Sequence, residues 1–280
     1  MSKISVILPC RNEEKTIGIC IEKIKIALNG KDYEIIVSDS SSDNSAEIAS
    51  GLGAKVIKHN KIGYGNAYLD GFKNISGDYI IMGDSDNTYD FLEIQKFIDK
   101  LDKDYDLVIG NRVDIKKGAM PILHRYIGNP FLSLMLRLLF KTSIRDSHCG
   151  FRAIKRESLE KLNLKTTGME FASEMIINAV KNDLKITQVP ISYYHRMGRS
   201  KLKSFNDGWK HLRFMLLYSP LYLFLIPGLI LFLFGLLIMI SLLFSPITLF
   251  GIKFSTHPSV IGALVSIVGY QIICLGLFAK

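Results

Sequence analysis

Two uncharged segments near the C-terminal end of the chain constrain its fold more than any other feature. Residues 215–250 contain no Asp, Glu, Lys or Arg, and residues 254–279 again contain none. Each segment exceeds the roughly 20 residues that a helix needs to cross the hydrocarbon core of a bilayer. Residues 221–243 are apolar on every face, which disfavours the alternative of a buried core helix. The sequence therefore predicts a two-helix transmembrane region over residues 219–280, in which small residues could allow close helix packing.

Basic residues cluster just before the first of these segments. Lys201, Lys203, Lys210 and Arg213 lie there, whereas residues 244–259 between the expected spans contain one Lys. Because cytoplasmic flanks of membrane helices are rich in Lys and Arg, we expect a multi-pass protein of the cell membrane or an endomembrane, with its large domain in the cytoplasm. Anionic lipid headgroups explain the net charge of +9, and without a nucleic-acid motif no nucleic-acid partner is expected.

The N-terminal part of the chain alternates short apolar runs with helix-length stretches. The apolar runs are residues 4–8, 34–37, 55–57, 79–82 and 107–109. This alternation predicts an α/β fold with a mostly parallel sheet covered by helices. Ligands bind such sheets beyond the carboxyl ends of the strands. Polar residues follow four of the runs, in segments 9–14, 38–44, 84–90 and 110–112. Gly63-Tyr64-Gly65 lacks the third glycine of a dinucleotide loop, so that site is not expected.

Two segments have the residue spacing of amphipathic helices. In residues 121–141 the apolar stripe consists of Ile127, Phe131, Leu134 and Leu138. In residues 200–218 the stripe consists of Leu202, Phe205, Trp209, Leu212 and Leu216. Basic residues flank both stripes, which is typical of helices that lie in the membrane interface. A surface helix whose stripe packs on the protein core is the alternative for each segment.

The turn Asp84-Ser85-Asp86 comes directly after the apolar run 79–82. Two carboxylates at alternate positions after a strand can converge on one hard cation such as Mg²⁺ or Mn²⁺, which in turn can hold a diphosphate. The tripeptide alone is a weak signal, because solvated carboxylates are also common in turns. The motifs around it decide between the two interpretations.

Ordered motifs accompany this turn. Residues 9–14 (PCRNEE) follow the first expected strand, and residues 37–45 (VSDSSSDNS) follow the second. With them, residues 3–213 resemble the inverting GT-A glycosyltransferases of family 2, within the dolichyl-phosphate mannose synthase and polyprenyl-phosphate glucosyltransferase group. The resemblance implies a GT-A nucleotide-diphospho-sugar transferase domain over residues 1–199, followed by an interfacial helix over residues 200–218.

The resemblance implies a nucleotide-sugar site in these early motifs. Its expected members are Pro9, Arg11, Glu13, Asp39, Asp84, Ser85 and Asp86. Asp39 would lie beside the base, and Asp84 and Asp86 would be ligands of Mg²⁺ or Mn²⁺. The family's usual Asp-Asp-Gly-Ser is Ser38-Asp39-Ser40-Ser41 here, which leaves the base open. The Gln that often follows the second metal-binding Asp is Thr88, which is the candidate third ligand.

The resemblance also implies a site for the acceptor phosphate. Residues 146–151 (DSHCGF) are similar to the family's acceptor loop, and residues 196–201 (RMGRSK) are similar to its Arg-x-Gly-x-Ser-Lys segment. The expected members of this site are Arg112, Arg125, Asp146, Arg196, Ser200 and Lys201. Arginine suits such a site because its fork of donors matches phosphate oxygens. The expected catalytic residues are Asp84, Asp86, Arg112 and Arg196.

We therefore expect an enzyme that moves a hexose from a GDP-mannose- or UDP-glucose-type donor to dolichyl or polyprenyl phosphate at the cytoplasmic membrane face. Its acceptor, with a second pKa of about 6, is mostly a dianion at neutral pH and needs little help from a base. One alternative is a processive polysaccharide synthase, whose Gln-x-x-Arg-Trp motif is missing because Gly208 precedes Trp209. The other is a non-catalytic membrane scaffold, against which the intact Asp84 and Asp86 argue. Assembly into a homo-oligomer stays open.

Overall fold

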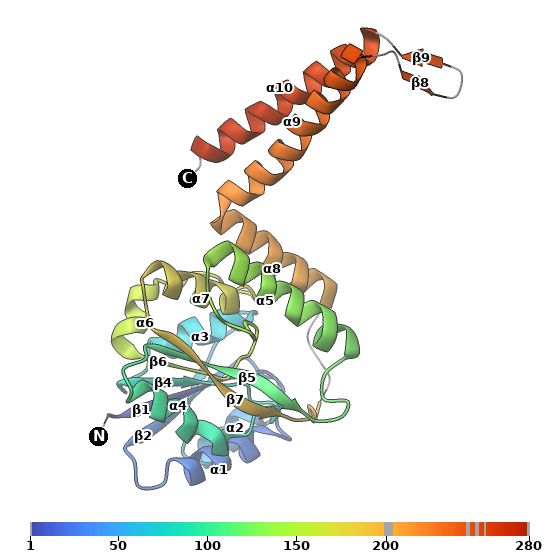
Figure 1. The fold of residues 1–280 in the computed structure, drawn as a ribbon. Helices are drawn as coiled ribbons and strands as arrows, with labels where there is room; N and C mark the ends of the chain where they lie inside the picture. Colours follow the sequence, from blue (N-terminus) through green and yellow to red (C-terminus); the bar gives the residue numbers. More distant parts are fainter. Residues whose placement is uncertain (1, 199–203, 245–246, 250–251, 255, 279–280) are drawn as a thin grey trace. The chain divides into compact units, whose positions relative to one another are not determined.

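The computed structural model describes residues 2–198, 204–244, 247–249, 252–254 and 256–278. The chain divides into two compact units, Met1–Leu212 and Arg213–Lys280. The first unit contains the sheet, and the second contains long apolar helices (Figure 1). The division falls inside helix α8 (Ser204–Tyr218), between the domain boundaries predicted at residues 199 and 218.

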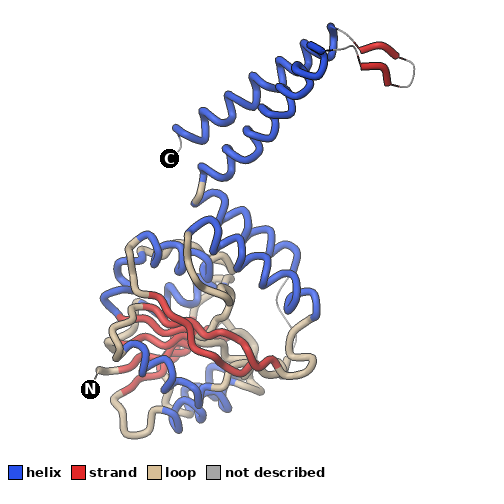
Figure 2. The backbone as a smooth tube through the Cα atoms, viewed as in Figure 1, coloured by secondary structure: helices blue, strands red, loops and turns tan. Residues whose placement is uncertain are grey.

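A seven-stranded sheet forms the centre of the first unit (Figure 2). Its order is β3-β2-β1-β4-β6-β5-β7, and β6 alone is antiparallel to both of its neighbours, β4 and β5. The strands are β1 Ile4–Cys10, β2 Tyr33–Asp39, β3 Lys55–Lys58, β4 Tyr79–Met82, β5 Leu107–Ile115, β6 Arg152–Lys155 and β7 Ile186–Tyr193. The predicted mostly parallel α/β sheet is thus confirmed.

Helices cover both faces of this sheet (Figure 1). One group is α1 Ile17–Ala27, α2 Ser45–Gly51 and α4 Ile94–Leu101, and the other is α3 Tyr64–Phe72, α6 Arg156–Leu162 and α7 Phe171–Lys181. Helix α4 shows why they pack: Ile94, Phe97, Ile98 and Leu101 recur at helical spacing and are all buried. Because both faces are covered, the central strands are near-continuous apolar runs.

The predicted amphipathic segment 121–141 contains the π-helix η2 (His124–Gly128) and helix α5 (Asn129–Phe140). All four residues of its apolar stripe are exposed, whereas Leu132 and Leu136 on the same helix are buried. The alternative in which this stripe packs on the core is therefore wrong. An exposed apolar stripe beside basic residues is what a membrane-interface helix requires.

Helix α8 contains the described part of the second amphipathic segment. Trp209 is exposed on it, whereas His211 is buried. Leu202 and the side chain of Phe205, which the sequence assigns to the same stripe, lie outside the described residues. The second segment is therefore helical in its described part, with an apolar residue on one side and an inward-facing histidine on another.

The second unit contains helices α9 (Pro220–Phe244) and α10 (Thr256–Phe278), joined through the hairpin of β8 (Ile247–Leu249) and β9 (Ile252–Phe254). By length and composition, Leu221–Leu242 and Pro258–Phe278 are both candidate membrane spans, and only 11% and 22% of their most apolar windows are buried. A core helix of a soluble protein would be mostly buried.

Small residues let α9 and α10 approach closely, as their composition predicts. A Cβ atom on Gly235 of α9 would lie 2.5 Å from the carbonyl oxygen of Gly262 on α10. A Cβ on Gly269 would lie 2.7 Å from the carbonyl oxygen of Gly228. Neither backbone could accommodate that atom without moving, so these glycines set the helix spacing.

Candidate active site

The carboxyl ends of β1, β2 and β4 bring three polar segments to one edge of the sheet. In the parallel register, Cys10 pairs with Asp39 and Ile7 pairs with Met82. The segments that follow these strands therefore leave the sheet at the same edge, where ligands of such sheets bind. They carry most of the residues expected to hold a nucleotide sugar.

Hydrogen bonds connect these segments to one another. The Asn12 amide N–H donates to Ser41 Oγ at 2.8 Å, and Asn12 Oδ1 accepts from the Ser42 amide at 2.8 Å. Asn12 has a φ of 54°, a left-handed conformation that a short polar side chain tolerates. Ser85 Oγ donates to the Pro9 carbonyl oxygen at 2.7 Å. The Asp84-Ser85-Asp86 turn is thus fastened to the end of β1.

Asp84 and Asp86 form a mostly buried pair of carboxylates. Burial and, to a smaller extent, the adjacent Asp86 carboxylate together raise the pKa of Asp84 to about 7. Asp86 Oδ1 accepts from the Thr88 amide at 3.1 Å and from the Thr88 hydroxyl at 2.6 Å, so Thr88 fixes its orientation. Two neighbouring carboxylates that are mostly buried fit a divalent cation, which would offset their repulsion.

Asp84 and Asp86 alone would not complete the coordination shell of a metal ion. Among the described residues, no group of three or more His, Cys, Asp or Glu side chains could hold a metal ion. Mg²⁺ is commonly bound through one or two carboxylates, with water and phosphate oxygens as its remaining ligands. The pair of Asp84 and Asp86 therefore suits a cation that arrives with a diphosphate.

Arg196 contacts the donor-side carboxylates in this structure. Its Nη1 lies 3.0 Å from Asp86 Oδ2, and its Nη2 donates to Glu13 Oε1. The sequence assigns Arg196 to the acceptor phosphate, so this placement shifts it toward the metal and nucleotide side. Its guanidinium supplies positive charge to two carboxylates that would otherwise repel each other.

Arg112 and Asp146 form a buried, bidentate ion pair. Arg112 Nε donates to Asp146 Oδ2 and its Nη2 donates to Oδ1, both at 2.7 Å, and the side chains are 7% and 11% exposed. Burial alone would raise the pKa of Asp146, but the Arg112 guanidinium outweighs burial and holds that pKa below its usual range. The pair orients a guanidinium whose Nη1 has no hydrogen-bond partner among the described residues.

Residues 146–150 form a loop that joins the Arg112–Asp146 ion pair to the Asp84 carboxylate. At one end the backbone of His148 lies beside the Asp146 carboxylate and helps to lower its pKa. At the other end, a Cβ atom on Gly150 would lie 3.0 Å from Asp84 Oδ2 and 2.7 Å from Tyr64 Oη. Only glycine therefore allows the loop to lie against Asp84. This loop, the acceptor loop below, brings both predicted halves of the site together.

Three residues expected at the acceptor phosphate are not brought to this pair in the described structure. Arg125 lies on η2, with its guanidinium carbon 5.3 Å from the centre of the Tyr126 ring. No described ion pair or hydrogen bond joins Arg125 to Arg112 or Asp146. Ser200 and Lys201 lie outside the described residues. Their roles stay predictions.

Sequence reasoning missed Tyr64, although it lies in the Gly63-Tyr64-Gly65 motif. The Tyr64 hydroxyl lies near the Asp84 carboxylate and partly offsets the rise in the pKa of that carboxyl. The flanking glycines have a different role: a Cβ on either would clash with the backbone of Thr166 or Thr167. The Gly65 amide donates to the Gly168 carbonyl oxygen at 3.2 Å, so this helix end does not offer that N–H to a phosphate. The two glycines therefore allow close packing of the start of α3 against residues 166–168, rather than the binding of a dinucleotide.

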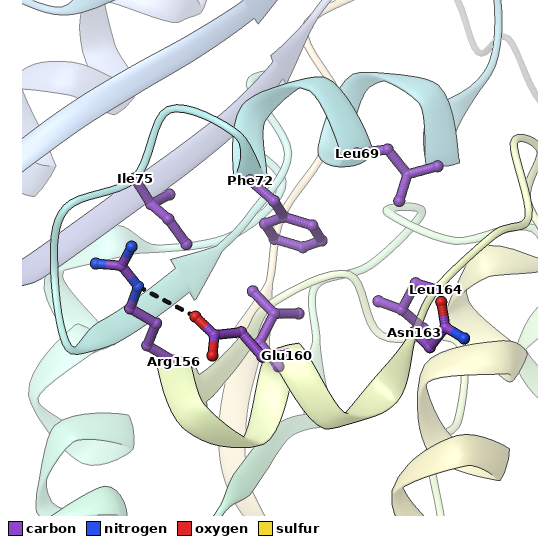
Figure 3. Close-up of a pocket in the computed structure, with 8 residues that line it drawn as sticks. Leu69, Phe72, Ile75, Arg156, Glu160, Asn163 and Leu164 are labelled. Carbon is purple, nitrogen blue, oxygen red and sulfur yellow. Dashed lines mark ion pairs between the residues drawn. The ribbon is translucent and has the colours of Figure 1, made fainter.

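Two pockets differ sharply in their chemistry. A polar pocket of about 320 Å³ lies at the site edge, and its lining residues are Arg11, Asp39, Ser40, Ser41, Lys58, His59, Asn60 and Ile62. A second pocket, of about 200 Å³, lies between α3 and α6 and is largely apolar, with the Arg156–Glu160 ion pair at one side (Figure 3). None of the predicted site residues lines the second pocket. The polar pocket is therefore the candidate for the nucleotide base.

Comparisons with known proteins give the family. The sequence matches Glycosyl transferase family 2 over residues 5–163. Low-salt glycan biosynthesis hexosyltransferase Agl6 from Haloferax volcanii is 42% identical over 281 residues, covering 99% of this chain and 68% of that protein. Dolichyl-phosphate hexose transferase from the same organism is 31% identical over 206 residues, covering 73% of this chain and 89% of that protein.

A solved structure shares the fold. It is glucosyl-3-phosphoglycerate synthase from Mycobacterium tuberculosis in complex with Mn²⁺, UDP and glucosyl-3-phosphoglycerate. The similarity has a TM-score of 0.65 at 24% sequence identity and covers 78% of this chain and 80% of that chain. The fold of the first unit is accordingly GT-A-like.

Proposed function

This chain belongs to glycosyl transferase family 2, and we propose that it moves a hexose from a GDP- or UDP-linked donor to dolichyl or polyprenyl phosphate, with inversion at the anomeric carbon. One of its relatives is named a dolichyl-phosphate hexose transferase. The observation that carries the proposal is the acceptor loop. It connects the Asp84 carboxylate to the Arg112–Asp146 pair, which supports a cation site beside a guanidinium that would bind the acceptor phosphate.

On the donor side, the polar pocket would hold the base. The Asp39 carboxylate, at the end of β2, would accept the ring N–H that uracil and guanine both carry. Asp84 and Asp86 would hold Mg²⁺ or Mn²⁺, as Mn²⁺ is present with UDP in the glucosyl-3-phosphoglycerate synthase structure. Bound there, the cation would neutralise charge on the leaving nucleoside diphosphate. Thr88 supports the site by orienting Asp86.

On the acceptor side, Arg112 would bind the lipid phosphate through the nitrogen that Asp146 leaves available. Arg125, Ser200 and Lys201 are proposed to complete this site. Arg196 would leave Asp86 and Glu13 when substrates bind, and would then pair with phosphate oxygens. The acceptor dianion is nucleophilic without a base, so the task of these residues is to bind it and direct its attack.

The membrane would deliver this acceptor. Two candidate spans anchor the chain, and the exposed apolar stripe of η2 and α5 suits the bilayer interface. Basic residues before the first span favour a cytoplasmic site, where nucleotide sugars are available. A lipid phosphate at the interface and a soluble donor would then meet at the carboxyl edge of the sheet.

The test is a transfer assay on membranes that contain the full chain. Radiolabelled GDP- and UDP-sugars are incubated with a polyprenyl phosphate and Mg²⁺ or Mn²⁺, and label in the lipid extract is measured. We expect one donor to label the lipid, and Asp86→Asn to reduce transfer by about 10²-fold or more in metal-buffered assays. Asp70→Asn, which alters the ion pairs of a largely buried carboxylate with Lys61 and Lys73 away from the site, is the control. Label in polymer or protein but not in lipid would contradict the proposal.

A further inference from the structure

Two histidines that the proposed mechanism does not use face each other in the first unit. The rings of His148, in the acceptor loop, and His211, on α8, meet edge to face with their centres 4.3 Å apart. His211 is only 4% exposed. His148 Nε2 is buried and has no hydrogen-bond partner among the described residues. The two rings are therefore held together by packing inside the protein.

Serine hydroxyls extend this contact in both directions. His148 Nδ1 lies 2.9 Å from Ser147 Oγ, which lies 3.0 Å from Ser133 Oγ on α5. His211 Nδ1 lies 2.8 Å from Ser173 Oγ on α7. Ser133, Ser147 and Ser173 are all fully or almost fully buried. These five residues form a continuous chain, the serine–histidine chain, that joins the acceptor loop to α5, α7 and α8.

The charge around His148 keeps its ring neutral. Burial lowers the pKa of His148 well below its usual range, and His211, Arg112 and Arg152 lower it further. The Asp146 carboxylate, two residues earlier in the chain, already forms a bidentate pair with Arg112. A ring with so low a pKa makes no ion pair and is a weak base. Its contribution is the shape and the hydrogen bond by which it holds the loop.

The loop that His148 holds has little freedom at either end. The His148 amide contacts the carboxylate that orients Arg112, and the Gly150 amide donates to Tyr89 Oη at 2.8 Å beside Asp84. A displacement of the His148 ring would therefore move the Arg112–Asp146 pair relative to Asp84. In a reaction that depends on in-line attack, such misplacement is costly even at about 1 Å.

We infer that His148 and His211 are positioning residues through which helix α8 sets the acceptor loop for attack by the lipid phosphate. This inference rests on the proposed function. Helix α8 leads into the first candidate span, so the contact joins the membrane-proximal helix to the loop between Arg112 and Asp84. None of the described residues that line the polar pocket, which lies at the ends of β1, β2 and β3, belongs to the serine–histidine chain.

The first test separates the two substrates in the full chain in membranes. For His148→Ala and His211→Ala we expect kcat/KM for polyprenyl phosphate to fall about tenfold, with the affinity for the nucleotide unchanged. His148→Asn, which keeps a hydrogen-bonding atom near the position of Nδ1, should restore part of the loss. Ser158→Ala is the matched control, because Ser158 is a buried serine that bonds Asp106 at 3.0 Å, outside the serine–histidine chain.

Because both histidines act through one contact, the double variant should transfer no more slowly than the poorer single variant. Multiplied effects, or equal losses for donor and acceptor, would overturn the inference.

A second measurement does not need catalysis. Hydrogen exchange of the amides of residues 146–151 should be faster in substrate-free His211→Ala than in the wild type, and unchanged in Ser158→Ala. Equal exchange in His211→Ala and Ser158→Ala would overturn the inference. If the wild type labels no lipid phosphate, the proposed function fails, and this exchange measurement still decides whether α8 holds the loop.

Discussion

The Asp146 carboxylate neutralises the buried Arg112 guanidinium and also lies beside the backbone of the acceptor loop at His148. Asp146→Asn leaves Arg112 buried without its counter-charge, so we expect the free energy of unfolding at pH 7 to fall by about 3 kcal/mol. Unfolding of the full chain in detergent measures this loss. Asp114→Asn, which removes an exposed partner of Lys116, should change stability little.

The same pair predicts a pH dependence. Because folding depresses the pKa of Asp146, the unfolded chain takes up the proton first as the pH falls. The stabilisation is therefore fully present above the unfolded pKa of about 3.9 and is lost as the pH falls through the lower folded value. The stability difference between wild type and Asp146→Asn should accordingly shrink below about pH 4. A difference that grows on acidification would contradict this assignment.

Removing the Arg196 side chain should have opposite effects on metal binding and on sugar transfer. It contacts Asp86 and Glu13 in the substrate-free protein, where a divalent cation would compete with it for Asp86 Oδ2. Arg196→Ala should therefore bind Mn²⁺ more tightly, by about tenfold, because a like charge has been removed from the site. Transfer to polyprenyl phosphate should nevertheless fall, and Arg196→Lys should restore it only in part. Titration with Mn²⁺ tests the metal affinity, and kinetics on the same samples test the transfer rate. Weaker Mn²⁺ binding by Arg196→Ala would show that Arg196 does not compete with the cation for Asp86.

At the scale of elements, the acceptor loop depends on close contact with α3. In Gly150→Ala the new methyl group would lie 2.7 Å from Tyr64 Oη and 3.0 Å from Asp84 Oδ2. We expect transfer to fall about tenfold without unfolding, because the loop must shift by a few tenths of an ångström. Adding Tyr64→Phe removes the nearest atom and should recover part of the activity. Recovery is measured against Tyr64→Phe alone; a double variant as slow as Gly150→Ala would show that the clash is not with Tyr64.

The elements that could be predicted from the sequence are those with a local apolar signal. The expected strand 79–82 coincides with β4, and the carboxyl edge follows from parallel strands with polar segments after them. Strand β6 gave no such signal, because it begins with Arg152, whose buried guanidinium donates to three backbone carbonyl oxygens. Its burial depends on tertiary partners that no short pattern contains.

The candidate site shows the same limit. The Asp84-Ser85-Asp86 turn and the motif at residues 146–151 could be read from the sequence, since each is local. The contact of Arg196 with Glu13 crosses 183 residues of sequence, and His148 meets His211 through the packing of α8. Both contacts are set by the fold rather than by spacing, so the sequence could identify Arg196 but not its partners.

At the scale of the whole molecule, charge and apolarity are divided between the two units. Candidate spans Leu221–Leu242 and Pro258–Phe278 contain no Asp, Glu, Lys or Arg, which disfavours an ion or proton path and favours an anchor. Exposed basic residues Lys210 and Arg213 precede the first span. The positive flank should stay in the cytoplasm, which places the hairpin between the spans on the opposite side.

Membrane-impermeant maleimide labelling of intact cells tests this orientation. Lys253→Cys, in the hairpin, should be labelled from outside, whereas Lys210→Cys should be labelled only after the cells are opened. Cys10, Cys20 and Cys149 are buried and belong to the first unit, which is cytoplasmic in this topology. Cys274 lies within the second candidate span. The native cysteines should therefore give little background labelling. Protease treatment of inverted vesicles should likewise digest the first unit and leave α9 and α10 protected.

If the first unit were instead sealed inside inverted vesicles, or Lys210→Cys were labelled in intact cells, the site would face away from the cytosol. A soluble nucleotide sugar could then not reach the polar pocket beside Asp39, and the proposed donor side would fail with the topology.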